Sequence, residues 1–149
     1  MATEHELTIT RVFDAPRELV FAAWTDPDHL AKWWGPAGFT ATSCTVALAD
    51  GGRWRVCISD GAGTDIWASG AYREIVRPER LVFTFAWDEP DGSRGLDTVV
   101  TVTLADRDGK TEMTFHQAAF PTAVVRDNHE SGWAETFADL VDHLKETVR

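Results

Sequence analysis

The side chain best placed to do chemistry in this 149-residue sequence is His129, which precedes Trp133 by four residues. Residues four apart lie on the same face of a helix, so we expect both side chains to point toward the interior. A histidine in such a position can anchor a polar group at the mouth of a pocket or donate a proton to a carbonyl. The alternative is a structural histidine that hydrogen-bonds to a neighbouring loop, and the sequence leaves both interpretations open.

Tyr72 is the only tyrosine in the chain and could contribute a hydroxyl group to the same pocket. The parity of its strand is ambiguous, because Trp67 and Gly70 fall on opposite faces unless a β-bulge at Gly70 resets the register. The sequence therefore leaves open whether Tyr72 points inward or outward.

Charged side chains are scattered along the predicted strands. A pair of carboxylates could serve acid–base catalysis, but exposed strand faces explain Asp65, Glu74 and Glu112 equally well. Arg55 alternates with Trp54 along the strand, so we expect Arg55 to face solvent or to pair with an acid. We predict no catalytic residue.

The sequence carries no motif for a metal or a cofactor. Its five histidines form neither His-x-His nor His-Glu-x-x-His, and Cys44 and Cys57 do not form Cys-x-x-Cys. A P-loop, a dinucleotide fingerprint and a Gly-x-Ser-x-Gly motif are also missing. We therefore expect no metal, no cofactor and two buried free thiols in a reducing compartment.

The charge balance limits the partners of this protein. Its 14 Lys and Arg residues against 24 Asp and Glu residues give a net charge of -10. Such a field repels phosphate backbones and anionic headgroups, so we expect neither nucleic-acid nor membrane binding. The chain begins without the features of a signal peptide, and no apolar run approaches about 18 residues. The predicted location is the cytoplasm.

Two short helices are expected after a first strand. Alternation from His5 to Phe13 indicates that strand. Asp14 is expected to cap the first helix, with Pro16 in its first turn, and Asp26 to cap the second, with Pro27 at its start. Three tryptophans lie within these two helices or at their ends: Trp24, Trp33 and Trp34.

Beyond these helices the apolar period changes twice. From Phe39 to Gln117 it is two, which indicates about six strands in an antiparallel meander. After Pro121 it returns to 3.6 and predicts one helix from about Ala123 to Thr147, with Gly132 allowing close packing against the sheet. The apolar face of this helix consists of His129, Trp133, Phe137, Leu140, Val141, Leu144 and Val148.

This order predicts a single α+β domain over residues 1–149. A curved antiparallel sheet of about six to seven strands would wrap around the long C-terminal helix. Large side chains between sheet and helix could line a pocket for an apolar ligand, although each could also simply fill the core. The candidate ligand-binding residues are Tyr72, Phe83, Phe85, Trp87, Met113, Phe115, His129, Trp133, Phe137 and Leu140.

Several short motifs in order along the chain carry a family resemblance. They include Asp14-Ala15-Pro16, Trp24-Thr25-Asp26-Pro27, Trp33-Trp34-Gly35-Pro36, Gly51-Gly52, Pro78-Glu79-Arg80-Leu81, and His129 with Gly132-Trp133. On these residues the sequence resembles the homologues of the activator of heat-shock protein 90 ATPase, within the START-like (SRPBCC) superfamily. The resemblance implies a helix-grip fold with a hydrophobic cavity between the sheet and the C-terminal helix.

The resemblance does not imply a single activity. Members of the superfamily carry lipids, bind hormones or antibiotics, or cyclise polyketides, and the family's name comes from a co-chaperone with a related C-terminal domain. We favour binding of a small hydrophobic molecule. Interaction with a chaperone and cyclase- or hydrolase-like catalysis in the same cavity are the alternatives.

Overall fold

The computed structural model describes residues 5–147, which form one sheet, two short helices and one long helix. The elements are β1 (His5–Phe13), α1 (Arg17–Thr25), α2 (Pro27–Trp33), β2 (Thr40–Val46), β3 (Arg53–Ser59), β4 (Asp65–Val76), β5 (Arg80–Trp87), β6 (Thr98–Arg107), β7 (Lys110–Phe120) and α3 (Ala123–Thr147). The strands lie in the order β1-β7-β6-β5-β4-β3-β2, and every neighbouring pair is antiparallel.

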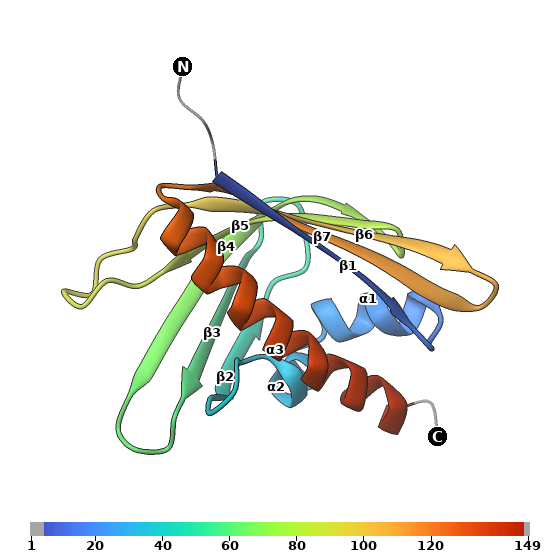
Figure 1. Cartoon of the computed structure of the whole chain (residues 1–149), viewed down its shortest axis with the longest axis horizontal. Helices are drawn as coiled ribbons and strands as arrows, with labels where there is room; N and C mark the ends of the chain where they lie inside the picture. Colours follow the sequence, from blue (N-terminus) through green and yellow to red (C-terminus); the bar gives the residue numbers. More distant parts are fainter. Residues whose placement is uncertain (1–4, 148–149) are drawn as a thin grey trace.

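The sheet curves around α3, which crosses its concave side (Figure 1). The predicted helix-grip architecture is therefore confirmed, including the limits of the long helix. Val148, which we expected on the apolar face of this helix, lies outside the described residues.

Alternation along the strands produces the apolar concave face. On β3, Trp54 and Val56 are buried, whereas Arg53 and Arg55 are exposed. On the central strand β5, Phe83 and Phe85 point into the same interior. Because successive strand residues point to opposite faces, β3 and β5 each contribute one row of large side chains to the core beneath α3.

The two short helices differ in how they begin. The residue before α1 is Pro16, whose extended backbone makes it the N-cap and carries no side-chain hydrogen bond. The prediction that Asp14 caps this helix with Pro16 in its first turn is therefore wrong, because the helix starts only after Pro16. The prediction for α2 is confirmed: the Asp26 carboxylate accepts a hydrogen bond from the backbone N–H of Asp28 at 2.8 Å, and Pro27 is the first residue.

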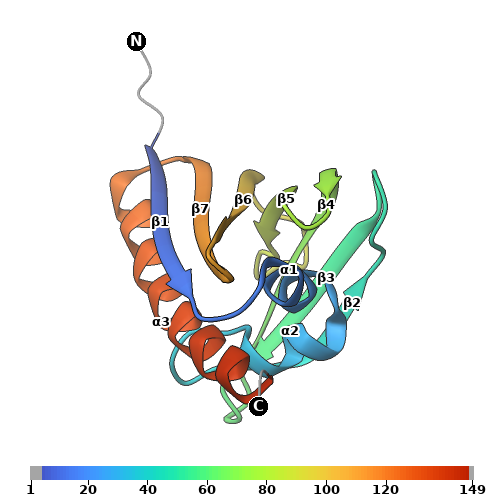
Figure 2. The same ribbon diagram turned by 90° about the vertical axis from the view of Figure 1, so that its right-hand side faces the viewer.

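Helix α2 links the two edges of the fold. It packs against β2 and α3, and α3 packs against β1 and β7 at the opposite edge (Figure 2). His29 of α2 meets His143 of α3, with 2.8 Å between Nδ1 and Nε2 of the two rings. The concave side of the sheet is thus covered by α3 and the two short helices, since α1 packs against β6 and β7.

Within residues 5–147, no helix combines the length and apolarity needed to cross a membrane. Both cysteines are free thiols, but only Cys57 is buried. Cys44 is half-buried because β2 is an edge strand, so the expectation of two buried thiols is wrong for Cys44.

Candidate functional site

A hollow of about 180 Å³ lies where β5, the C-terminal end of α2 and the middle of α3 meet. We call it the α3 hollow. Most of its lining is apolar and aromatic, as is usual for sites that bind small molecules. The lining residues are Trp34, Gly35, Pro36, Phe85, Trp87, Asn128, His129, Gly132, Trp133 and Thr136.

A second hollow of about 200 Å³ adjoins the first, and we call it the loop hollow. The loop between β5 and β6 contributes Glu89, Gly95 and Leu96 to it, and α3 contributes Val125. Three side chains line both hollows and therefore form the wall between them: Phe85, Trp87 and His129.

His129 is hydrogen-bonded through both ring nitrogens. Its Nδ1 lies 2.9 Å from the carbonyl oxygen of Val125, which can only accept, so Nδ1 carries the proton. Its Nε2 accepts a hydrogen bond from the indole N–H of Trp87 at 2.9 Å. Burial lowers the pKa of His129, an effect that the Val125 carbonyl opposes. His129 is thus a neutral acceptor whose partners lie on β5 and on its own helix.

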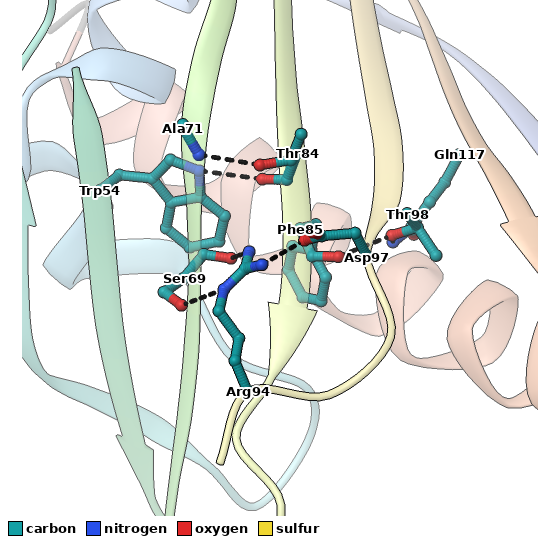
Figure 3. Close-up of polar contacts among 9 residues, drawn as sticks. All are labelled: Trp54, Ser69, Ala71, Thr84, Phe85, Arg94, Asp97, Thr98 and Gln117. Atoms are coloured by element: carbon teal, nitrogen blue, oxygen red, sulfur yellow. Dashed lines mark hydrogen bonds and ion pairs between the residues drawn. The ribbon is translucent and has the colours of Figure 1, made fainter. Parts of the chain in front are cut away.

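A chain of buried hydrogen bonds supports the site from behind. The indole N–H of Trp133 donates to Oε1 of Gln117 at 2.8 Å. The Gln117 amide donates to the Thr98 hydroxyl at 2.8 Å, and that hydroxyl donates to the carbonyl oxygen of Phe85 at 3.0 Å. Figure 3 shows the part of this chain from Gln117 to Phe85. The chain ties α3 to β7, β6 and β5, and so fixes the position of the Trp133 ring.

Gln117, which is fully buried, was not among the predicted site residues. The signal that could have identified it is its parity, because it follows Met113 and Phe115 on the inward side of β7. A polar side chain in that row needs a buried partner, and an indole N–H is a suitable donor.

The structure brings four of the ten predicted residues together at the α3 hollow: Phe85, Trp87, His129 and Trp133. Four others are fully buried core residues that line neither hollow: Met113, Phe115, Phe137 and Leu140. Tyr72 and Phe83 instead border an interior hollow of only about 10 Å³. The indole N–H of Trp24, which borders the same small hollow, has no hydrogen-bond partner among the described residues.

Tyr72 points inward. Gly70 and Tyr72 share the inward parity of β4, and Trp67 lies on the opposite face, where its ring stacks under the Arg55 guanidinium at 4.1 Å. The register shift in β4 falls between Tyr72 and Glu74, so no bulge at Gly70 is needed. Burial raises the pKa of the Tyr72 hydroxyl, which therefore stays protonated.

Gly132 faces the α3 hollow. A Cβ atom at this position would have the Pro36 Cβ, 4.0 Å away, as its nearest neighbour. The expectation that Gly132 allows close packing against the sheet is therefore wrong, because the open space in front of it leads to Pro36.

Three of the four charged residues weighed in the sequence form ion pairs outside the two hollows: Arg55 with Asp88 at 3.0 Å, Glu74 with Arg80 at 2.8 Å, and Glu112 with Arg107 at 2.9 Å. This confirms that Arg55 pairs with an acid. Among residues 5–147, no group of three or more His, Cys, Asp or Glu side chains is arranged to hold a metal ion.

The arrangement of one long helix held by a curved antiparallel sheet defines a helix-grip protein. The chain belongs to the family described as Activator of Hsp90 ATPase homolog 1-like protein, which its sequence matches over residues 14–145. This confirms the family resemblance carried by the sequence motifs. No curated protein matches the chain.

Solved structures from several bacteria share this fold. A protein from Chromobacterium violaceum is 28% identical, with a TM-score of 0.84 over 93% of this chain and 96% of that one. A protein from Arthrobacter aurescens is 26% identical, with a TM-score of 0.85 over 95% of this chain and 86% of that one. The AHSA1 protein from Silicibacter pomeroyi, at 23% identity, has a TM-score of 0.87 over 96% of this chain and 99% of that one, and supports the fold alone.

Proposed function

We propose that this protein binds a small hydrophobic molecule in the α3 hollow. The observation that carries the proposal is the meeting of four aromatic side chains around an apolar space of about 180 Å³: Trp34, Phe85, Trp87 and Trp133. Transfer of apolar ligand surface from water into such a space is favourable, and the few polar groups at its edge can orient the ligand.

The close packing of the aromatic rings around the α3 hollow supports the proposal. The Trp34 ring packs 5.3 Å from Trp133 and 5.6 Å from Trp54, measured between ring centroids. Trp133 is held in addition by its hydrogen bond to Gln117. Because these rings are already ordered, a ligand would lose little affinity to the ordering of side chains. We place this binding in the cytoplasm, where the free thiols of Cys44 and Cys57 would stay reduced.

Substitutions at Gly132 test the proposal. Gly132→Leu should fill the α3 hollow, whereas Gly132→Ala, whose Cβ has an ordinary contact with Pro36, should leave it open. Tryptophan fluorescence and thermal unfolding would be followed while fatty acids, flavonoids and aromatic polyketides are added. A bound ligand should change the emission of the lining tryptophans and raise the melting temperature of the wild type and of Gly132→Ala.

In the same titrations, Gly132→Leu should weaken binding by about tenfold or more, which corresponds to about 1.4 kcal/mol. A panel that shifts neither signal in the wild type would count against the proposal. So would equal binding by Gly132→Leu and Gly132→Ala, because the ligand would then lie elsewhere.

Interaction with a chaperone is the second candidate function, and the description of the family supports it. The test is the ATPase rate of purified heat-shock protein 90 with and without this protein. Gly132→Leu separates the two functions, because a surface contact outside the α3 hollow should survive that substitution. A change in ATPase rate together with a silent ligand panel would make the chaperone function the better proposal.

A further inference from the structure

The wall between the two hollows contains one hydrogen-bond donor and one acceptor that face each other. The indole Nε1–H of Trp87 can only donate. The Nε2 atom of His129 can only accept, because the Val125 carbonyl keeps the proton on Nδ1. The two nitrogens are 2.9 Å apart, and both side chains line the α3 hollow and the loop hollow.

A ligand that extends from one hollow into the other must separate these two groups. An apolar ligand would leave the Trp87 N–H and the His129 Nε2 without partners inside the protein. A polar group left without a partner away from water is unfavourable, so a purely apolar occupant should stay within one hollow. A ligand that bridges the hollows must supply a matching acceptor and donor at this point.

A hydroxyl group supplies both functions through one oxygen atom. Its lone pair can accept from the Trp87 indole, and its proton can be donated to His129 Nε2. An ether or a ketone can satisfy only Trp87. We propose that Trp87 and His129 together select phenols or alcohols, by taking the ligand hydroxyl between Nε1 and Nε2. This inference rests on the proposed function and specifies the class of ligand.

The surroundings of Trp87 allow this separation. Trp87 is the last residue of β5, is half-buried and leads directly into the loop to β6. His129 is half-buried and lies in the second turn of α3. Phe85, the third member of this wall, is in contrast buried. Trp87 and His129 are therefore the two members of the wall that are closest to solvent and have more room to separate.

Three probes of similar shape test the inference: naphthalene, 1-methoxynaphthalene and 1-naphthol. Their dissociation constants would be measured by calorimetry on the wild type, Trp87→Phe, His129→Phe and the matched control Trp67→Phe. The control removes the indole N–H of an outward-facing tryptophan that lines neither hollow. In the wild type and the control, 1-naphthol should bind about tenfold more tightly than 1-methoxynaphthalene, as expected for one additional hydrogen bond.

In Trp87→Phe and His129→Phe this preference should fall below about threefold, while naphthalene still binds. The indole N–H resonance of Trp87, assigned by its loss in Trp87→Phe, should shift with 1-naphthol in the wild type. Equal affinities of the wild type for 1-naphthol and 1-methoxynaphthalene would overturn the inference without touching the proposed function. Failure of all three probes to bind would also overturn the inference. The proposed function is tested separately, by the Gly132 variants and the broader panel of ligands.

Discussion

At the residue scale, Trp133 combines the duties of a core residue and a site residue. Its ring centroid lies 4.6 Å from that of Phe115 and 5.5 Å from that of Phe137, so most of the ring belongs to the core. Its remaining surface lines the α3 hollow, and its N–H holds Gln117. The surface that Trp133 presents to the candidate site is therefore held in place by core packing and by Gln117.

Trp133→Ala should lower the free energy of unfolding by about 3–5 kcal/mol, as is typical when a large buried aromatic is removed. The loss combines a new cavity with an unpaired Gln117 Oε1. Urea denaturation would measure it, with Trp67→Ala as the control. Trp67 faces outward and stacks with Arg55, an interaction of about 0.5–1 kcal/mol. Equal losses in the two variants would contradict the assigned position of Trp133.

Gly70→Ala should also destabilise the protein, by about 1–3 kcal/mol or more. A Cβ at Gly70 would collide with the carbonyl oxygen of Thr84 and lie 2.7 Å from Trp54 Nε1. That indole donates to the same carbonyl at 3.2 Å, so β4 and β5 are already linked through a side chain at this point (Figure 3).

Gly132→Ala is the comparison for this prediction. Its Cβ has room, and alanine favours the helix over glycine by about 0.5–1 kcal/mol. Chemical denaturation should therefore move the two variants in opposite directions. A loss of stability in Gly132→Ala, or none in Gly70→Ala, would mean that the spaces around these glycines differ from those described.

At the scale of elements, periodicity was enough to predict the order of helices and strands. The change from a period of two to one of 3.6 after Pro121 predicted α3 correctly, because one long amphipathic helix must bury a single face. The start of α1 could not be predicted in the same way, since the local backbone of Pro16 decides it. Periodicity says which face of an element is apolar, but it does not say which other element covers that face.

The contact between α2 and α3 includes a hydrogen bond between two histidine rings. One hydrogen bond joins His29 and His143, so one of the two facing nitrogens must be without a proton. Burial, His29 and Lys32 all lower the pKa of His143, and Glu146 opposes them. Two further carboxylates, Asp139 and Asp142, share a surface hollow with His143.

This contact should weaken in acid. The pKa of His143 is lower in the folded protein than its usual value of about 6.5, so below about pH 6.5 the unfolded chain takes up the proton more readily. The stabilisation that the neutral His143 provides is therefore complete above about pH 6.5, and it is lost as the pH falls through the pKa of His143 in the folded protein. Between about pH 7.5 and 5.5, His143→Gln should therefore lose less free energy of unfolding than the wild type in urea titrations. Parallel pH profiles of the two proteins would show that the contact carries no such dependence.

At the scale of the whole molecule, the candidate site was predictable only in part. Helical phase and strand parity identified Phe85 and Trp133 as inward, which the structure confirms. The same rules also selected Phe115 and Phe137, because inward side chains of the core and of a hollow follow one pattern. The hollow itself depends on the distance between α3 and the segment that follows α2, which contains Trp34 and Pro36. The periodicity of the sequence does not encode that distance.

The charge distribution also acts at this scale. Although the net charge is -10, three arginines line a polar hollow on the surface: Arg53, Arg55 and Arg94. Arg55 is bound to Asp88 at 3.0 Å. Arg94 is bound to Asp97 and donates to the Ser69 carbonyl oxygen at 2.7 Å (Figure 3). Two of these arginines are thus neutralised by acids close to them in space.

We therefore expect this protein to bind neither duplex DNA nor vesicles that contain anionic lipids. Gel-shift and vesicle co-sedimentation measurements would test this expectation. Low ionic strength is the most demanding condition, because salt then screens electrostatic interactions least. The double variant Asp88→Asn, Asp97→Asn is a stricter test, since it frees Arg55 and Arg94 while the rest of the molecule keeps its excess of acids. Binding of the wild type or of the double variant to DNA or to vesicles, if it weakens as salt is added, would contradict the expectation. It would show that attraction to the arginine-lined hollow exceeds the overall repulsion.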